Sequence, residues 1–193
     1  MQNYDPDADP DASAQSPGRR ASSSGHLMTT DLSLVLMPQT PADQAAIDKL
    51  DERTFGPGRF ARSAYRLREG REPDFTLSFV ARVGTLLVGA NRMTRIACGP
   101  IEALLLGPLT VEPAFRSGGI GEALVLKSLE AAKEAGHELV LLVGDEPYYT
   151  RMGFRKVPMG HLTFIGPVDP DRLLYCELRE GALERARGRV GRL

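Results

Sequence analysis

Residues 104–135, LLLGPLTVEPAFRSGGIGEALVLKSLEAAKEA, decide the fold of this chain. The segment opens with a short apolar run that ends at a Glu-Pro pair, which is typical of a buried strand. From Gly121 onward the apolar residues recur with the period of a helix, and most of the charged residues fall on the opposite side. The segment therefore predicts a buried strand followed by an amphipathic helix.

The junction between this strand and this helix reads Arg-Ser-Gly-Gly-Ile-Gly over residues 116–121. The first N–H groups of a helix have no intrahelical acceptor and carry the positive end of the helix dipole. Glycines let an anion approach those groups closely, and the guanidinium of Arg116 suits a phosphate. The junction therefore indicates a diphosphate site, and a Gly-rich turn without a ligand is the simpler alternative.

Two common phosphate-binding motifs do not fit the junction. The nucleotide P-loop ends in Gly-Lys-Ser/Thr, and no lysine follows these glycines. The dinucleotide fingerprint needs a third small residue where this chain has Leu124, and it needs a βαβ unit early in the fold. An anion site at this junction would therefore belong to another class of protein, and the Gly-rich turn without a ligand stays the alternative.

In these residues the chain resembles the GNAT superfamily of coenzyme A-dependent N-acetyltransferases, in particular its small bacterial members. The family motif Arg/Gln-x-x-Gly-x-Gly/Ala is matched by Arg116, Gly119 and Gly121, and a Val-x-Pro precedes it at residues 111–113. A second family element, aromatic-Tyr-x-x-x-Gly-Phe, is matched at residues 148–154. The resemblance extends from residue 31 to about residue 180, and two spaced motifs in the right order make it specific.

The expected fold is of the mixed α/β (α+β) class, with a mostly antiparallel central sheet flanked by helices in the order βααβββ-α-β-α-ββ. Hydrophobic patterns predict strands at residues 31–38, 75–83, 86–97, 101–111, 138–143 and 173–178, and helices at residues 40–55, 60–68 and 121–135. A further strand is expected from Gly153, and a short helix capped by Asp145. A bulge is expected at Gly107-Pro108, because proline cannot donate to a strand ladder. The resemblance implies that the central strand splays from its neighbour there.

The resemblance also implies acetyl-CoA as the co-substrate, without a metal. The pantetheine arm would run along Leu109, Thr110 and Val111, where a backbone N–H near Leu109 would polarise the thioester carbonyl. The diphosphate would be held by Arg116 and by the backbone of the turn that follows it. The residues of that turn are Ser117, Gly118, Gly119, Ile120, Gly121 and Glu122. The family often carries Arg or Lys at the position of Gly118, so one phosphate contact is missing from the expected set.

Direct attack by an amine on a thioester needs an acid that protonates the departing thiolate. The residue that corresponds to the family acid is Tyr149, whereas Tyr148 is interpreted as a core aromatic residue. No general base stands out in the sequence. Glu102 and Glu112 flank the central strand, but neither matches a fixed family position.

The predicted function is acetyl transfer from acetyl-CoA to a primary amine of a small-molecule or peptide acceptor. The alternative is a non-catalytic acyl-CoA sensor or interaction module with the same fold. Arginines at 59, 62, 66 and 68 are interpreted first as a solvated face. Because the first helical region shapes the acceptor pocket in the family that the chain resembles, the alternative is that they favour an acidic acceptor. Nucleic-acid binding through the Arg-rich C-terminus is not expected, since the formal net charge is −1. The sequence does not indicate the oligomeric state, and a homodimer is one possibility.

The 193 residues are expected to form one domain at 31–180, with a disordered tail at 1–30 and a flexible basic tail at 181–193. The two cysteines, Cys98 and Cys176, are expected to be buried reduced thiols. No apolar run approaches the roughly 18 residues of a membrane span, and no signal-peptide core is present. A cytoplasmic protein is therefore expected.

Overall fold

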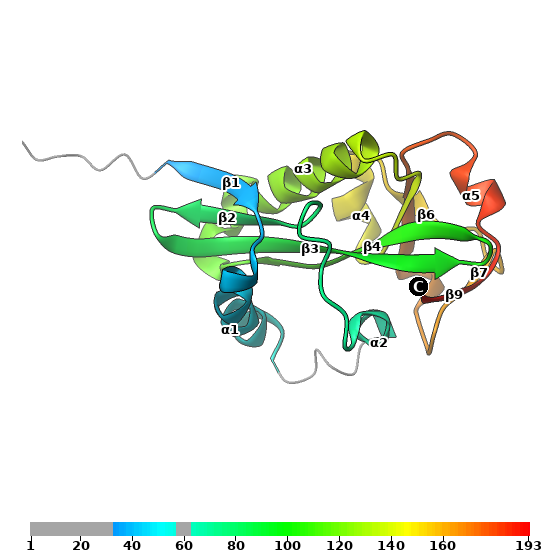
Figure 1. The fold of residues 1–193 in the computed structure, drawn as a ribbon, viewed down its shortest axis with the longest axis horizontal. Coiled ribbons are helices and arrows are strands. Elements are labelled where there is room, and N and C mark those ends of the chain that lie inside the picture. The colour runs from blue at the N-terminus through cyan, green and yellow to red at the C-terminus, as the bar shows by residue number, and fades with distance from the viewer. Residues whose placement is uncertain (1–32, 57–62) are drawn as a thin grey trace, which may run out of the picture. The chain divides into compact units, whose positions relative to one another are not determined.

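The computed structural model describes residues 33–56 and 63–193, and these form a mixed sheet with helices on both faces (Figure 1). The predicted tail at residues 1–30 lies outside the described residues, as do Arg59 and Arg62. The class predicted from the sequence, a mostly antiparallel sheet flanked by helices, is confirmed.

Within the described residues the sheet has nine strands, and its main path runs in the order β1-β2-β3-β4-β5-β8-β6. The strands are β1 (Leu34–Pro38), β2 (Phe79–Val83), β3 (Leu86–Cys98), β4 (Ile101–Val111), β5 (Leu139–Val143), β6 (Arg155–Lys156), β7 (Leu162–Thr163), β8 (Leu173–Glu177) and β9 (Gly188–Arg192). Strands β4 and β5 are parallel, because helix α3 crosses over between them, and the other neighbours on this path are antiparallel.

Helices cover both faces of the sheet (Figure 1). Helices α1 (Gln44–Phe55) and α2 (Ser63–Arg68) lie on one face, and α3 (Ile120–Glu134) and α4 (Glu146–Tyr149) lie on the other. On the first face Ile47 and Leu50 of α1 pack against Val80, Leu87 and Ala90. On the second, the apolar side of α3 packs into a cluster with β3, β4 and β5. The apolar residues that recur with the helical period in the sequences of α1 and α3 are therefore the ones that these helices bury against the sheet.

Strand β4 carries the bulge predicted at Gly107-Pro108. Its pairing with β3 shifts register there, since Asn91 lies opposite Leu109 but Met93 lies opposite Leu106. Its parallel pairing with β5 ends at Leu105. The two strands therefore pair only over the first half of β4, which is the splay that the resemblance implies.

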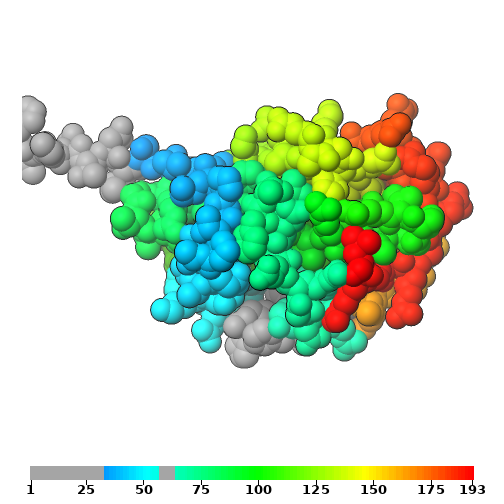
Figure 2. All heavy atoms as spheres, in the orientation of Figure 1, coloured from blue at the N-terminus to red at the C-terminus, as the bar shows by residue number. Residues whose placement is uncertain are grey.

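The C-terminal segment differs from the flexible tail predicted at residues 181–193. It forms α5 (Ala182–Arg185) and then β9, which pairs with β3 and with β7. Ala182, Ala186 and Val190 are fully buried in a cluster beneath β4 and β5. Figure 2 shows the C-terminal residues, in red, packed against the α2 region, where Arg192 Nε donates to the carbonyl of Arg66 at 3.0 Å.

Two smaller expectations concern single residues. Asp145 is the N-cap residue of α4, but its side chain makes no capping hydrogen bond and instead pairs with Arg172 at 3.1 Å. Cys98 and Cys176 are both buried free thiols, as predicted. Burial raises the pKa of Cys98 to about 12, so this thiol stays protonated.

Candidate active site

The junction between β4 and α3 forms an open glycine turn. A 3₁₀ segment, Pro113–Gly118, follows β4, and Gly119 then starts α3 with φ at 71°, a left-handed conformation that favours glycine. A Cβ added to Gly118 or Gly119 would meet no atom within 4 Å. Arg116 lies exposed on this turn, with its Nε donating to the carbonyl of Val111 at 3.3 Å. The turn thus presents a helix start, a cation and open space together.

The start of α3 packs against the splayed end of β4. A Cβ at Gly121 would lie 3.6 Å from the side chains of Leu109 and Val111, and 2.4 Å from the hydroxyl of Tyr148. Only glycine permits this close approach. The predicted diphosphate residues and the predicted pantetheine residues therefore lie side by side, with the hydroxyl of Tyr148 between α3 and α4.

The predicted catalytic residue, Tyr149, lies in a group of three aromatic rings. Its ring meets Tyr148 edge-on at 4.9 Å and Phe154 edge-on at 5.7 Å between centroids. A Cβ at Gly144 would come within 2.3 Å of this ring, so Tyr149 leans on the backbone just past the end of β5. Burial raises the pKa of Tyr149 well above its ordinary value, which keeps the hydroxyl protonated at neutral pH.

Tyr148, interpreted from the sequence as a core aromatic residue, is half-buried and packs against the core cluster beneath α3. Its hydroxyl lies against the start of α3, and burial raises its pKa too. The guanidinium of Arg151 lies over its ring, 5.3 Å from the centroid. Arg151 also approaches Glu122 of α3 at 3.8 Å. A second exposed cation therefore stands near the helix start, close to where Gly118 supplies none. Sequence reasoning missed Arg151, although its position within the Tyr-Tyr-x-x-x-Gly-Phe element was a signal.

A cavity of about 570 Å³ opens on the other face of the sheet, between α1, the α2–β2 connection and the bulge of β4. Its lining is strongly charged, and among the residues that contribute are Asp48, Asp51, Tyr65, Arg68, Arg92 and Pro108. Thr110 donates its hydroxyl to Asp51. The side chain of Thr110, one of the three residues predicted for pantetheine, therefore points to the cavity side, while its backbone pairs with Ala90 of β3.

Arg92 of β3 is held in place at this cavity. Its Nε donates to the hydroxyl of Thr94 at 3.2 Å, and its Nη2 donates to the carbonyl of Arg71. Burial lowers the pKa of Arg92, whereas the nearby Asp51 and Asp48 act in the opposite direction. The guanidinium and the two carboxylates are therefore close enough to interact electrostatically. Spacing along the sequence gave no sign of this cluster.

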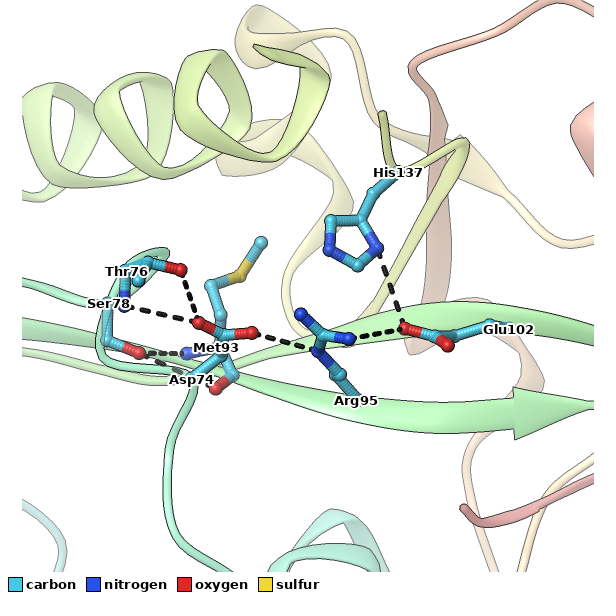
Figure 3. A network of polar contacts seen from close by, with 7 residues as sticks. All are labelled: Asp74, Thr76, Ser78, Met93, Arg95, Glu102 and His137. Carbon is cyan, nitrogen blue, oxygen red and sulfur yellow. Dashed lines mark hydrogen bonds and ion pairs between the residues drawn. The ribbon is translucent and has the colours of Figure 1, made fainter. Parts of the chain in front are cut away.

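The two glutamates considered as bases are placed elsewhere. Glu102 lies at the start of β4, in a network with Arg95 at 3.5 Å and His137 at 3.7 Å (Figure 3). Glu112 pairs with Arg53 at 2.9 Å. Each is thus tied to a cation by an ion pair. Within residues 33–56 and 63–193, no group of His, Cys, Asp or Glu could hold a metal, and no helix is long and apolar enough to cross a membrane.

Comparisons with known proteins point to one family. The model of the acetyltransferase (GNAT) domain matches residues 75–156. The chain is 27% identical over 164 residues to the uncharacterized N-acetyltransferase YhbS of Escherichia coli (strain K12), which covers 81% of this chain and 95% of YhbS. It is 30% identical over 117 residues to the uncharacterized N-acetyltransferase YjhQ of the same strain, covering 58% of this chain and 65% of YjhQ.

Solved structures share the fold. A crystal structure of YhbS from Escherichia coli in complex with CoA matches with a TM-score of 0.72 at 24% identity, over 84% of this chain and 91% of that one. A GNAT family acetyltransferase from Brucella melitensis in complex with acetyl-CoA matches with a TM-score of 0.57 at 25% identity, over 74% of this chain and 95% of that one.

Proposed function

The chain carries a GNAT acetyltransferase domain, and on this premise we propose that it moves an acetyl group from acetyl-CoA to a primary amine by direct attack. The observation that carries the proposal is the place where β4 leaves β5 beside the glycine turn of α3. A splayed strand offers unpaired backbone groups, and a helix start offers N–H donors, so together they suit a long molecule that ends in a diphosphate.

In this proposal the cofactor is bound mainly by backbone. The N–H groups of residues 117–122 and the guanidinium of Arg116 hold the diphosphate, and Arg151 supplies the second cation. The backbone of residues 109–111 holds the pantetheine arm. The N–H near Leu109 donates to the thioester oxygen and stabilises the negative charge that develops on it.

The chemistry needs few side chains. The neutral amine attacks the thioester carbon, a C–N bond forms, the C–S bond breaks, and the thiolate leaves. Tyr149 gives the thiolate its proton, the amine releases a proton to solvent, and solvent returns one proton to the Tyr149 phenolate. The hydroxyl of Tyr149 is protonated at neutral pH, as a proton donor must be before the step, and burial raises its pKa and so makes it a weaker acid than an exposed tyrosine.

The acceptor would enter from the opposite face, through the cavity beside the β4 bulge. Pro108 lines that cavity and is the chain neighbour of Leu109, so an amine there would approach the predicted thioester position from the α1 side. Both a small molecule and a peptide end remain predictions for the acceptor. A cytoplasmic location and a homodimer likewise stay predictions.

Calorimetric titration with acetyl-CoA tests the cofactor site. Gly118→Asp places a carboxylate on the turn without a left-handed residue being replaced, and Gly118→Ala is the matched neutral control. Because like charges in contact cost several kcal/mol, Gly118→Asp should raise the Kd at least about tenfold. Gly118→Ala should bind like the wild type.

Failure of the wild type to bind acetyl-CoA would overturn the proposal. Equal Kd values for Gly118→Asp and Gly118→Ala would show that the diphosphate does not bind at this turn. After binding is established, thiol release from acetyl-CoA in the presence of different amines identifies the acceptor and separates an enzyme from a sensor.

A further inference from the structure

We infer that the cavity between α1, α2 and β4 takes a compact zwitterion, a free α-amino acid, as the acetyl acceptor. The inference rests on the proposed function and deepens it by naming the substrate class. It is carried by charges of both signs that line one cavity and reach the same part of β4.

The cavity wall on α1 suits an ammonium group. Asp48 and Asp51 are three residues apart on the helix, so their side chains share one face. The hydroxyl of Thr110 donates to Asp51 and holds the carboxylate beside the end of β4. Thr110 follows Leu109, whose backbone is proposed to meet the thioester. Asp51 therefore brings a negative charge to the place where the ammonium group must arrive, and the ammonium loses one proton to solvent before the neutral amine attacks.

A second set of residues suits a carboxylate. Arg92 lines the cavity, and its guanidinium is fixed by the hydroxyl of Thr94 and the carbonyl of Arg71. Arg68 also lines the cavity and reaches the bulge, since a Cβ at Gly107 would lie 3.6 Å from its Nη1. Guanidinium groups that are held in place bind carboxylates well, because little freedom is lost on binding.

These two sets together select for a compact molecule with both charges. The groups that meet Arg68 and Asp51 lie three residues apart on β4, at Gly107 and Thr110. A dicarboxylate without an amine would face Asp48 and Asp51, and the second cation of a diamine would meet Arg68 and Arg92, although Glu69 and Glu72 also line the cavity. Like charges brought together in a binding site cost several kcal/mol. The acidic acceptor expected from the arginines was therefore only half of the chemistry.

The test compares ligands that differ by one charge. The twenty protein amino acids are titrated into the protein, with and without saturating CoA, each beside its α-amide and its α-hydroxy acid. The amide loses the anion, the hydroxy acid loses the cation, and 1,4-diaminobutane serves as a purely cationic probe. We expect at least one amino acid to bind at least about tenfold more tightly than its amide and its hydroxy acid. The inference is wrong if no amino acid binds, or if an amide, a hydroxy acid or the diamine binds as tightly.

Variants assign each charge to its wall. Arg92→Met should abolish the preference for the amino acid over its amide, and Arg68→Met provides a second test of the anion wall should Arg92→Met not fold. Asp51→Asn should weaken the binding of the amino acid and of its amide equally, and should leave the binding of the hydroxy acid unchanged. The matched controls are Arg66→Met and Glu52→Gln, exposed residues of the same helices that do not line the cavity. Unchanged ligand preference in both Arg92→Met and Arg68→Met would overturn the inference.

The outcome is separable from that of the proposed function. If acetyl-CoA does not bind, the proposed function fails. The titrations without CoA then still test whether the cavity binds a free amino acid. If acetyl-CoA binds and is turned over with simple amines or diamines in preference to amino acids, the function stands and this inference alone fails.

Discussion

Burial keeps the hydroxyl of Tyr149 protonated, and its neighbour Tyr148 places a second hydroxyl against the start of α3. Either hydroxyl could therefore be the general acid. Substitution by Phe distinguishes the two residues, because Phe keeps the ring packing and removes only the hydroxyl. We expect Tyr149→Phe to lower kcat by about 10²–10⁴-fold, the usual contribution of a general acid, without changing the Kd for acetyl-CoA. Tyr148→Phe should change kcat only a few-fold. A larger loss in Tyr148→Phe would move the acid to that residue.

His137 gives the molecule a pH-dependent stability. Burial and the nearby Arg95 lower its pKa, and Glu102 and Asp74 oppose them incompletely (Figure 3). The folded protein therefore binds this proton less well than the unfolded chain, whose histidine titrates near 6.5. The stabilising difference is fully present above about pH 6.5 and is lost as the pH falls through the lowered pKa.

His137→Gln removes this titration. Calorimetric melting between pH 8 and pH 5 should show a smaller drop in Tm for His137→Gln than for the wild type. The titration of Asp74 does not contribute over this pH range. Burial raises the pKa of Asp74, but hydrogen bonds from Thr76 and Arg95 lower it more, so the pKa lies below its ordinary value. Parallel melting curves for the two proteins over this range would contradict the prediction.

Among the elements, β9 was the hardest to predict. Its sequence, Gly-Arg-Val-Gly-Arg, has a single apolar residue, so neither alternation nor a hydrophobic run marks it as a strand. The strand exists because Val190 is buried under β4 and β5 while the backbone pairs with β3. By contrast, β3, β4, β5 and α3 carry strong periodic patterns, and their predicted bounds lie within a few residues of those observed.

Val190 therefore stabilises the fold in a way that a flexible tail could not. Val190→Ala should lower the free energy of unfolding by about 1–3 kcal/mol, since it removes buried methyl groups and leaves a cavity. Arg189→Ala, one residue earlier and exposed, is the control and should change it little. Urea denaturation of the three proteins measures the difference, and an unchanged Val190→Ala would restore the tail interpretation.

The cofactor side and the acceptor side of the site were not equally predictable. The cofactor side is one continuous segment, residues 109–122, so a motif in the sequence can reveal it. The acceptor side is assembled from pieces far apart in the chain. Asp51 and Thr110 are separated by 59 residues, and nothing in an amphipathic helix says which distant strand its polar edge will meet. Tertiary packing alone brings these charges together.

For the molecule as a whole, the sheet separates the two proposed binding regions, which meet at the splayed end of β4. The glycine turn of α3 lies on one face, and the charged cavity beside α1 and α2 lies on the other. Gly118 and Arg92 share no hydrogen bond or ion pair among the described contacts, and sites separated in this way usually act independently to within about 0.5 kcal/mol. Gly118→Asp should therefore weaken the binding of acetyl-CoA and leave the binding of the acceptor unchanged. Arg92→Met should weaken the binding of the acceptor and leave that of acetyl-CoA unchanged.

Combining the two substitutions tests this separation. With both substrates far below their KM values, the initial rate of the double variant should fall by the product of the two single losses, to within about twofold. Any acceptor whose acetylation is slowed by Arg92→Met will serve, because the test needs a measurable loss from each single substitution. A double loss much smaller than the product would mean that cofactor binding reorganises the cavity, so that the sheet couples the two regions through the β4 bulge.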